Sequence, residues 1–520
     1  MKRTFHYDVN GKTMTRSINY IPVRYIVAVL ITLLEVLAVI GIVVALCYFV
    51  PYFYLAAWVT EIYCVIRIAS SDDNPDYKVP WLVVVLIIPI AGFMLYFLFY
   101  SRKLGKKYLR RLDELKKKRY TQNDRALLER LQEESATAAA QAQMLCRVAD
   151  TTLFSGGRQE YFALGEEMHK RMLTDLEAAE KFIYLEFFIV EDGAFWGSIL
   201  EILKQKAANG VDVKLLYDDI GCMMTLPGNY HKTLRQYGIE ALPFARLRGN
   251  ADSEFNNRNH RKILVIDGRV GYTGGVNLAD EYINTVVRFG HWKDIGIRLE
   301  GEAVWELTRL FVVDFGISSR NMPEYHCDLY PTQNDDANGF VIPFGDGPHP
   351  LYGTRVSKSV ILNLLASATD YVWVTTPYLI IDNGLCEAIE HAAMRGVDVR
   401  IVVPHIPDKK MVFAMTRSFY PRLLRCGVRI YEYTPGFIHA KCYLADDRYA
   451  MIGTVNLDYR SLVHHFENGV WMYRTSILPD IKADLQDTLN RSQEITLADC
   501  KTGVMQSALR SVVRIFAPLL

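Results

Sequence analysis

The sequence contains the same pattern of histidine, lysine and aspartate at two places far apart in the chain. Both copies read H-x-K-x-x-x-x-D; they comprise His260, Lys262 and Asp267, and then His439, Lys441 and Asp446. Each copy is followed by glycine and asparagine, Gly274 and Gly275 with Asn277 after the first and Gly453 with Asn456 after the second. Imidazole can act as a nucleophile or as a general acid and base, whereas lysine and amide groups can bind an anion. This combination of side chains indicates phosphoryl-transfer chemistry.

A single histidine in such a pattern would more often have a structural role. Two copies with the same trailing glycine and asparagine favour one active site assembled from two halves of the chain. The net charge of +1 gives no sign of polyanion binding by the chain as a whole. The nine cysteines are scattered without a C-x-x-C pair, which favours free thiols in a reducing compartment over disulfides or a zinc site. We therefore expect no metal and no other cofactor.

Further landmarks recur in the same order in both halves. Apolar, strand-like segments at 182–189 and 371–378 are each followed by a helix-like segment, at 199–207 and 386–393. Each helix-like segment leads to a glycine, Gly210 or Gly396, which is typical of a helix end. A second glycine follows in each half, Gly238 and Gly427. Strands that alternate with helices predict an α/β fold, with two pseudo-symmetric β/α sandwich halves and mixed sheets.

This repeat also predicts how the reactive residues are positioned. Because apolar residues follow each histidine, we expect His260 and His439 to begin strands. The lysine comes two residues later and therefore projects from the same face of the strand as the histidine. The aspartate then ends the strand at a turn, at Asp267-Gly268 and at Asp446-Asp447.

The N-terminal part of the chain is apolar enough to enter a membrane. Residues 26–50 contain a single charge, Glu35, and residues 81–100 contain none. Runs of about 20 apolar residues cross a bilayer as helices, so we expect both segments to be spans. Residues 51–68 are interrupted by Glu61 and Arg67 and form either a weaker span or a helix packed against the others. The sequence thus predicts two or three transmembrane helices that are retained as an anchor.

Composition also suggests the domain boundaries. We divide the chain into a membrane region at 1–101, a basic and helical linker at 102–148, a first half at 149–335 and a second half at 336–520. The linker begins with a dense block of lysine and arginine at 102–119, which is expected on the cytoplasmic side. The C-terminal residues, 508–520, have the pattern of an amphipathic helix that lies on the membrane interface or packs on the core.

The motifs resemble those of the phospholipase D superfamily and, within it, the bacterial cardiolipin synthases. The resemblance extends from about residue 75 to the end, and the segments that carry it are 257–262, 376–378, 437–441, 453–461 and 466–468. The spacing of Trp81, Pro89, Gly92 and Tyr96 also looks like the N-terminal membrane segment of that family. Thr454 stands where the family commonly has serine, a change that keeps the hydroxyl group.

The resemblance implies a mechanism with a covalent phosphohistidine, which divides one difficult displacement into two. It favours His260 as the nucleophile and His439 as the acid and base. It also implies that Asp267 and Asp446 each hold the imidazole of the opposite half, although their spacing fits turn caps equally well. The groups expected to donate to the phosphate oxygens are Lys262, Lys441, Asn277 and Asn456. Supporting roles at the site are expected for Glu467, Ser461, Tyr378 and Glu186.

The resemblance further implies a reversible phosphatidyl transfer between two phosphatidylglycerol molecules, which gives cardiolipin and glycerol. The expected partners are phosphatidylglycerol or other anionic phospholipids and the membrane; nucleic acid is not expected, and a homo-oligomer is left open. The expected location is the bacterial cell membrane, with several spans and the catalytic part in the cytoplasm. The alternatives are a phospholipase D-type hydrolase, transfer to another alcohol such as serine, a nuclease, and a non-catalytic membrane scaffold. A nuclease would need a basic groove with stacking aromatics rather than membrane spans, and the intact paired motifs argue against a scaffold.

Overall fold

The computed structural model describes residues 3–9, 12–18, 23–49, 51–71, 74–88, 90–99, 124–246, 257–319, 339–349, 351–501, 503 and 514–519. The chain forms two compact units. The smaller unit comprises Met1–Lys103, Leu247–Asn257 and Gly503–Leu520, and the larger comprises Leu104–Arg246 and Arg258–Thr502. The larger unit contains both histidine–lysine motifs.

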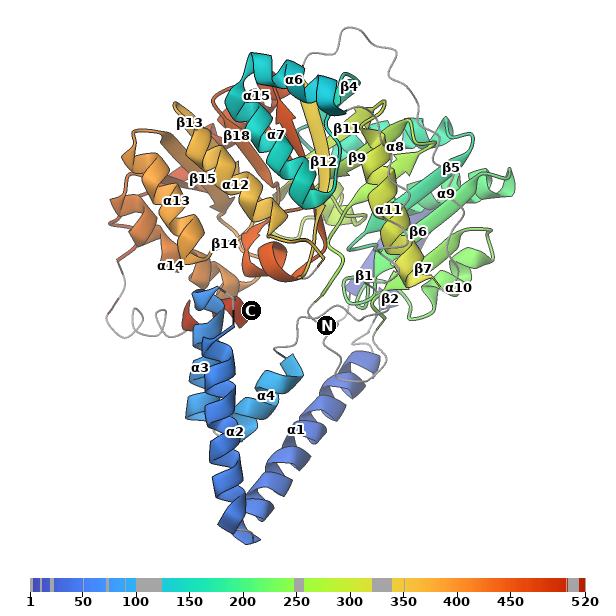
Figure 1. The fold of residues 1–520 in the computed structure, drawn as a ribbon. Coiled ribbons are helices and arrows are strands. Elements are labelled where there is room, and N and C mark those ends of the chain that lie inside the picture. Colours follow the sequence, from blue (N-terminus) through green and yellow to red (C-terminus); the bar gives the residue numbers. More distant parts are fainter. Residues whose placement is uncertain are drawn as a thin grey trace. The chain divides into compact units, whose positions relative to one another are not determined.

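The first sheet of the larger unit has seven strands in the order β4-β11-β9-β8-β5-β6-β7 (Figure 1). Their bounds are Arg158–Phe162, Gly296–Glu300, Val270–Gly274, Ile263–Ile266, Phe182–Phe187, Asp212–Asp218 and Glu240–Phe244. Strands β5, β6 and β7 are parallel, and the remaining neighbours are antiparallel. The sheet is therefore mixed, as the alternation of strands and helices predicts.

The second sheet has nine strands in the order β22-β16-β15-β13-β18-β19-β21-β12-β3. Their bounds are Ser492–Ile495, Arg429–Tyr433, Asp398–Pro404, Tyr371–Thr375, Cys442–Ala445, Tyr449–Gly453, Glu467–Tyr473, Phe340–Asp346 and Phe154–Ser155. Without the edge strands β22 and β3, this order repeats that of the first sheet, β12 corresponding to β4 and β16 to β7. The predicted α/β fold with two pseudo-symmetric halves is confirmed.

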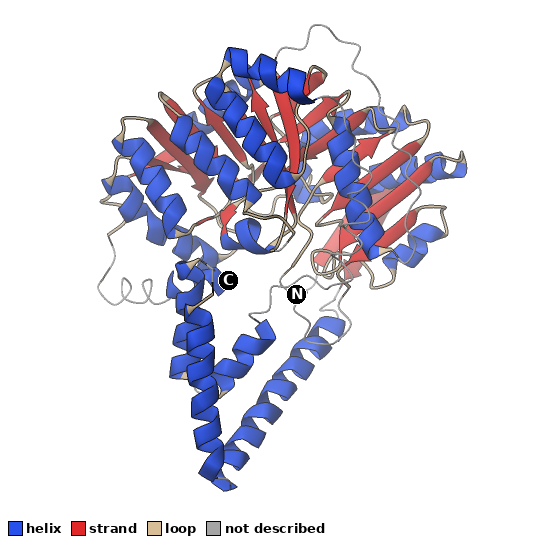
Figure 2. Cartoon of the chain, in the orientation of Figure 1, coloured by secondary structure: helices blue, strands red, loops and turns tan. Residues whose placement is uncertain are grey.

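Helices surround these strands (Figure 2). In the first half they are α8 (Gly165–Glu177), α9 (Ala194–Ala208), α10 (Tyr230–Arg235) and α11 (Val304–Ser318). In the second half they are α12 (Val356–Ser367), α13 (Asn383–Met394), α14 (Lys410–Arg425) and α15 (Leu478–Asn490). Gly210 follows α9 with φ +87° and Gly396 follows α13 with φ +94°, a left-handed conformation that favours glycine. The predicted helix ends at these two glycines are confirmed.

One hydrophobic core joins the two halves. Leu307 and Phe311 of α11 belong to the same buried cluster as Ile263 of β8, Trp373 of β13 and Leu444 of β18. The same cluster includes side chains of α15. Because apolar side chains of both sheets are removed from water together, the halves are stabilised as one body rather than as two independent ones.

The described part of the predicted linker, 124–148, is helical. It consists of α6 (Asp124–Glu134) and most of α7 (Ala136–Ala149), whose first turn is capped by Ser135 through a 3.2 Å bond to the Ala138 N–H. On α7, Gln141 accepts a 3.2 Å hydrogen bond from the Trp471 indole N–H of β21. This helix therefore packs on the second sheet. The basic block at 102–119 lies outside the described residues.

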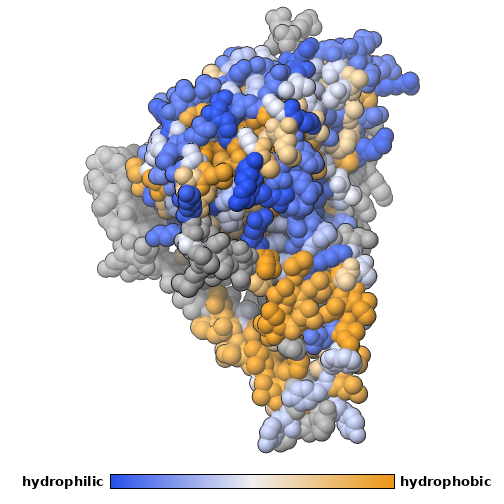
Figure 3. Space-filling view, turned by 90° about the vertical axis from the view of Figure 1, so that its left-hand side faces the viewer, coloured by the Kyte–Doolittle hydropathy of each residue, from blue (hydrophilic) through white to orange (hydrophobic). Residues whose placement is uncertain are grey.

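The smaller unit contains one long apolar helix. A hairpin of β1 (Arg3–Val9) and β2 (Lys12–Ile18) precedes α1 (Val23–Phe49), and α2 (Pro51–Ala69) follows it. Within the described residues, α1 is the one helix long and apolar enough to cross a membrane, and its segment Val29–Leu46 is not buried inside the unit. Apolar side chains gather along the helices of this unit (Figure 3). The span predicted at 26–50 thus corresponds to α1.

The segment 81–100, predicted to be one span, is not a single helix. This segment is divided between α3 (Pro75–Ile87) and α4 (Ala91–Phe99), and Ile90 between them has a left-handed φ of +65°. The break coincides with a proline at position 89 of the sequence, which has no N–H to continue a helix. At Gly92 a β-carbon would lie 2.4 Å from the Val84 carbonyl oxygen, so α4 folds back closely against α3.

The predicted C-terminal amphipathic helix, 508–520, lies mostly outside the described residues. The described end of the chain includes the short helix η4 (Ala517–Leu519), which contacts α3. This contact falls within the smaller unit.

Candidate active site

The first histidine–lysine pair lies between a contact with the opposite half and a strand of its own sheet. Asn259 forms a parallel bridge with Phe466, and the His260 N–H donates to the Phe466 carbonyl at 2.9 Å. Strand β8 begins at Ile263, directly after Lys262. The prediction that the histidine begins a strand is therefore wrong for this copy, because its backbone bonds to the other half.

The second pair repeats this arrangement. Strand β17 (Gly436–Ile438) pairs in parallel with β10 (His291–Lys293) of the first half, and the His439 N–H donates to the Lys293 carbonyl at 2.7 Å. Strand β18 then begins at Cys442, directly after Lys441. Here too the histidine precedes the strand rather than beginning it. The backbone at both motifs is thus fixed by the seam between the halves.

Each imidazole is paired with a carboxylate of the opposite half. His260 Nδ1 lies 2.9 Å from both oxygens of Glu467, and His439 Nδ1 lies 2.6 Å from Asp294 Oδ2. Both carboxylates are buried. When Nδ1–H donates to a carboxylate, the neutral imidazole keeps its lone pair on Nε2. The carboxylates thus favour, in both histidines, the tautomer whose Nε2 can attack phosphorus or accept a proton, and Lys441 Nζ also lies 2.7 Å from His439 Nδ1.

Hydroxyl groups complete the surroundings of Glu467. The Ser461 hydroxyl donates to Oε1 at 2.7 Å, and the Thr454 hydroxyl donates to Oε2. Ser461, predicted to support the site, is thus in direct contact with the partner of His260. Thr454 makes this bond with the hydroxyl that threonine shares with serine. Glu467, also predicted to support the site, is the centre of this network.

Gly275, two residues before Asn277, lies where a larger residue would not fit. A β-carbon at Gly275 would lie 2.0 Å from Asp294 Oδ1, the carboxylate that holds His439. Any other residue would push this carboxylate away from the imidazole. At Gly453 a β-carbon would lie 2.3 Å from the Asn468 carbonyl, where β19 runs beside β21. The trailing glycines of the motif therefore permit close approach of the strands that carry the carboxylates.

Burial and nearby cations keep both imidazoles neutral before a phosphodiester binds. Burial lowers the pKa of His260 to about 3, and Lys262 adds to this effect. Burial and the charge of Lys441 lower the pKa of His439 to about 4. Burial alone would raise the pKa of Glu467, but its bonds with His260 outweigh this and hold that pKa below its usual range. A neutral imidazole beside an ionised carboxylate is the form needed for nucleophilic attack.

The two lysines of the motifs are buried beside the histidines. Lys262 Nζ donates to the His260 carbonyl at 2.7 Å, and Lys441 Nζ donates to the His439 carbonyl. Burial, followed by the repulsion of Lys441, lowers the pKa of Lys262 to about 7. Burial lowers the pKa of Lys441 to about 8. Two weakly solvated ammonium groups at one site form a strong attraction for a phosphate anion.

Asp267 and Asp446 do not contact the imidazoles, and the role implied for them by the family resemblance is wrong. The Asp267 carboxylate accepts the backbone N–H groups of residues 180–182, at 2.7–2.8 Å. The Asp446 carboxylate accepts those of residues 369–371, at 2.8–2.9 Å. Both aspartates lie in left-handed turns with φ of +53°. They cap the backbone that leads into β5 and β13, in agreement with the alternative role as turn caps.

The two predicted phosphate-binding asparagines are buried and partly engaged. Asn277 accepts the Ile189 N–H at 3.0 Å and donates to the Tyr282 hydroxyl at 2.7 Å. Asn456 donates to Asp458 at 3.0 Å. The bond to Tyr282 and the bond to Asp458 each use one of the two N–H groups that an asparagine amide carries. The second N–H of each amide is the group that a phosphate oxygen would require.

The two remaining supporting residues lie further from the reactive atoms. Glu186 accepts a 2.5 Å bond from Asn259, the residue before His260, and burial raises the pKa of Glu186 well above its usual value. The Tyr378 hydroxyl donates to Asp408 at 2.6 Å. Glu186 thus positions the backbone of the first motif, and Tyr378 ties two loops of the second half together.

The sequence analysis missed Asp294. The sequence signal for Asp294 is visible only when the strands of the two halves are aligned. Asp294 lies two residues before Gly296, which pairs with Gly274. In the same way, Glu467 lies two residues before Gly469, which pairs with Gly453. The repeat therefore contains D-x-G in one half and E-x-G in the other at equivalent register. An acidic residue two positions before the glycine of this strand was the available sequence signal.

Aromatic side chains around the imidazoles were also missed. The Phe188 ring lies edge-on to His260 at 5.1 Å. Tyr282 lies edge-on to His439 at 5.4 Å, and Trp292 lies 5.6 Å from it. These rings help to bury both imidazoles, and they border the site on the His439 side.

Among the described residues, His260, His465 and Glu467 form one group whose ligand atoms lie within 4.8 Å of one another, as a metal site would require. The Glu467 carboxylate already accepts bonds from His260, Ser461 and Thr454. The donor set is therefore consistent with a hydrogen-bond network that orients His260.

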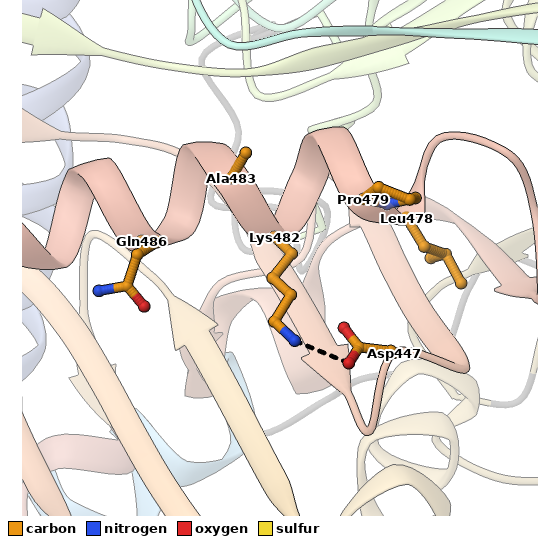
Figure 4. A pocket seen from close by; sticks show the side chains of 6 residues that line it. All are labelled: Asp447, Leu478, Pro479, Lys482, Ala483 and Gln486. Atoms are coloured by element: carbon orange, nitrogen blue, oxygen red, sulfur yellow. Dashed lines mark hydrogen bonds and ion pairs between the residues drawn. The ribbon is translucent and has the colours of Figure 1, made fainter.

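A depression on the surface of α15 lies outside this arrangement. It is lined by Asp447, Leu478, Pro479, Lys482, Ala483 and Gln486, and Lys482 Nζ lies 2.7 Å from Asp447 (Figure 4). None of the reactive residues lines it. We assign no part of the chemistry to this depression.

Comparison with known families agrees with the geometry of the site. The family model described as "Cardiolipin synthase, PLD-like domain" matches residues 172–287 and 361–490, one segment in each half. A second model, "Phospholipase_D-nuclease N-terminal", matches residues 62–99. A phosphatidylserine synthase of Haemophilus influenzae shares the fold over 74% of this chain and 98% of its own, with a TM-score of 0.56 and 16% identity.

Similar sequences extend over almost the whole chain. An uncharacterized protein of Streptococcus mutans is 43% identical over 88% of this chain and 99% of its own length. A cardiolipin synthase of Halalkalibacterium halodurans is 33% identical over 89% of this chain and 92% of its own. One of Alkalihalophilus pseudofirmus is 32% identical over 88% and 91%. With two histidine–lysine motifs held by carboxylates of opposite halves, this chain belongs to the phospholipase D-like cardiolipin synthase family.

Proposed function

We propose that the chain transfers a phosphatidyl group from one phosphatidylglycerol to another, giving cardiolipin and glycerol. The observation that supports this most directly is the pairing of His260 with Glu467 and of His439 with Asp294. This pairing provides two oriented imidazoles for one phosphodiester. Relatives that match over most of their length and carry the name cardiolipin synthase support the choice of substrate.

In the first step, His260 Nε2 attacks the phosphorus of a phosphatidylglycerol. The bond between phosphorus and the glycerol headgroup oxygen breaks, and a phosphohistidine forms. The leaving alkoxide takes its proton from His439, whose imidazolium is stabilised by Asp294 and by the negative charge of the bound phosphodiester. Glu467 stabilises the positive charge that develops on His260.

In the second step, a headgroup hydroxyl of another phosphatidylglycerol attacks the phosphohistidine. His439 takes the proton of this hydroxyl, and the bond between phosphorus and His260 breaks. Cardiolipin leaves and the free imidazole is restored. Lys262, Lys441 and the unused amide N–H groups of Asn277 and Asn456 stabilise the charge on the phosphate oxygens in both steps.

We extend the proposal to the membrane arrangement and the division of the chain. The long helix α1 anchors the protein, and the catalytic halves, 149–335 and 336–520, act on the cytoplasmic face of the bacterial membrane. The basic block at 102–119 supports this orientation, because positive charge accumulates on the cytoplasmic side. A reporter fused after residue 70 would test the number of spans.

The decisive experiment incubates the purified full chain in detergent with phosphatidylglycerol. Cardiolipin and glycerol in equal amounts are the expected products. Phosphatidic acid as the sole product would indicate the alternative hydrolase and would refute the synthase. Acid-labile labelling of the protein by radioactive phosphatidylglycerol, lost in His260→Ala, would identify the nucleophile.

A further inference from the structure

Two neighbouring loops beside the proposed active site expose apolar side chains. In the first, Val286 and Val287 are 44% and 78% exposed. In the second, which leads into α14, Ile406 is 37% exposed, and Met411 in the first turn of α14 is 57% exposed. We call these four residues and the two lysines between Ile406 and Met411, Lys409 and Lys410, the apolar rim.

The two loops of the apolar rim lie side by side. A β-carbon at Gly290, which ends the first loop, would lie 3.2 Å from the Ile406 side chain. The Ile406 N–H also donates to the Gly436 carbonyl at 3.4 Å, in the strand that pairs with β10 directly after the first loop. The exposed residues of both loops therefore belong to one surface.

The first loop is firmly rooted beside His439. The loop begins after Tyr282 and ends at Trp292, and the rings of both residues contact His439. Asn284 closes its base, since it accepts the Trp292 N–H at 2.8 Å and donates to the Trp292 carbonyl at 3.0 Å. The tip with Val286 and Val287 thus stands directly beyond the aromatic border of the site.

The charges of the apolar rim favour an anionic partner. Lys409 and Lys410 are exposed, and among the described residues neither forms an ion pair. Arg288 on the first loop is paired with Glu281 at 2.9 Å, and Asp408 beside the lysines accepts the Tyr378 hydroxyl, so the surface carries two lysines against one carboxylate. Exposed apolar tips beside lysines are typical of surfaces that enter the headgroup region of an anionic bilayer.

We propose that the apolar rim docks into a bilayer surface that contains anionic phospholipid and delivers lipid to the His439 side of the site. This inference rests on the proposed function, because only a lipid substrate requires the site to face a bilayer. A surface with apolar tips alone would fit many partners. The paired lysines and the contact with His439 favour the membrane.

The kinetic test compares one substrate in two physical forms with full-length protein. We expect Val287→Asp to raise the KM for bilayer phosphatidylglycerol about tenfold, since the loop loses apolar burial and gains a repelled charge. Turnover of short-chain phosphatidylglycerol, dissolved as monomers, should stay within about twofold of wild type. Met394→Asp, on an exposed methionine at the end of α13, is the matched control and should leave both unchanged. Equal losses on both forms, or no loss on the bilayer, would overturn the proposal.

A second measurement does not depend on turnover. An environment-sensitive thiol probe on Val287→Cys in proteoliposomes should be quenched by nitroxide lipids, whereas the same probe on Met394→Cys should not. The unsubstituted chain gives the background of its own thiols. Quenching should be stronger in bilayers with phosphatidylglycerol than in pure phosphatidylcholine, and Lys409→Glu with Lys410→Glu should remove this difference. A probe at 287 that is not quenched would refute the docking, whereas a wild-type chain that makes no cardiolipin from either substrate form would refute only the proposed function.

Discussion

Each reactive imidazole depends on a carboxylate far away in the sequence. Glu467 lies 207 residues after His260, and Asp294 lies 145 residues before His439. Local spacing identified the histidines and lysines, because these residues recur in a fixed pattern. It could not identify their partners, because a hydrogen bond between halves depends on the seam and leaves no fixed spacing. The role of imidazole partner for Asp267 and Asp446 came from the family resemblance, whereas their spacing fitted turn caps equally well.

The first prediction at this scale concerns the two carboxylates. We expect Glu467→Gln and Asp294→Asn each to lower kcat by a factor between about 10² and 10⁴, because the amide no longer fixes the tautomer or stabilises the imidazolium. Single-turnover measurements should show slower phosphohistidine formation in the first variant. Glu494→Gln, which removes an exposed ion pair with Arg429 at the sheet edge, is the control. Either variant retaining more than half of wild-type kcat would contradict the pairing.

The second prediction concerns pH. Before substrate binds, the pKa of Lys262 is lowered to about 7 and that of Lys441 to about 8, so both lysines lose their charge as pH rises through this range. A neutral amine does not attract a phosphodiester, and kcat/KM should therefore fall as pH increases above about 7. Bound phosphate favours the protonated lysines, so kcat should fall only at higher pH. Rates measured between pH 5 and 10 would show the fall of kcat/KM and the later fall of kcat. A kcat/KM that stays constant to pH 10 would contradict the assigned role of the lysines.

The strands and turns determine where the reactive atoms lie. Glycine-terminated helices and apolar runs identified both sandwich halves from sequence, since these signals are local. The edge strand β3 and the break between α3 and α4 were not foreseen. Pairing of β3 with the second sheet is a long-range contact, and the break depends on a turn within an apolar run. Composition alone reports such a run as one span.

At this scale the aspartate turns make a distinct prediction. Asp267→Asn and Asp446→Asn should each lower the free energy of unfolding by about 1–3 kcal/mol, because charge-assisted bonds to three backbone N–H groups are weakened. The kcat of the folded fraction should stay within about threefold of wild type, as neither carboxylate contacts an imidazole. Denaturant unfolding in detergent, combined with initial rates, separates the two effects. The control is Asp370→Asn, whose side chain is 76% exposed. A hundredfold loss of kcat at unchanged stability would restore the role implied by the family.

At the scale of the whole molecule, both halves share one hydrophobic core and one site. The core cluster that contains Ile263 also contains Leu444, and the seam is formed by backbone bonds at both motifs. The sequence repeat predicted this combination in outline, because a duplicated half-site has a function only if the halves meet.

A mixing experiment tests whether the site is complete within one chain. Full-length His260→Ala and His439→Ala proteins, each inactive, should show no recovered turnover when reconstituted together. Each variant lacks one of the two histidines, and the two halves of each chain are held together by a common core. Neither chain can therefore supply the histidine that the other lacks. The same amounts of wild-type and variant protein, mixed in parallel, provide the control for dilution. Clear recovery of cardiolipin formation in the mixture would mean that halves exchange between chains.

The crossed pairing of imidazole and carboxylate also has an evolutionary consequence. Two identical copies of one half, facing each other as separate subunits, would create the same exchange of partners. In a single chain, each imidazole can still pair with the carboxylate of the other half, but the two halves no longer need to have the same sequence. Here one histidine is held by glutamate with two hydroxyl donors, and the other by aspartate beside a glycine. In the proposed mechanism this difference in surroundings accompanies a difference in role, with attack by one imidazole and proton transfer by the other.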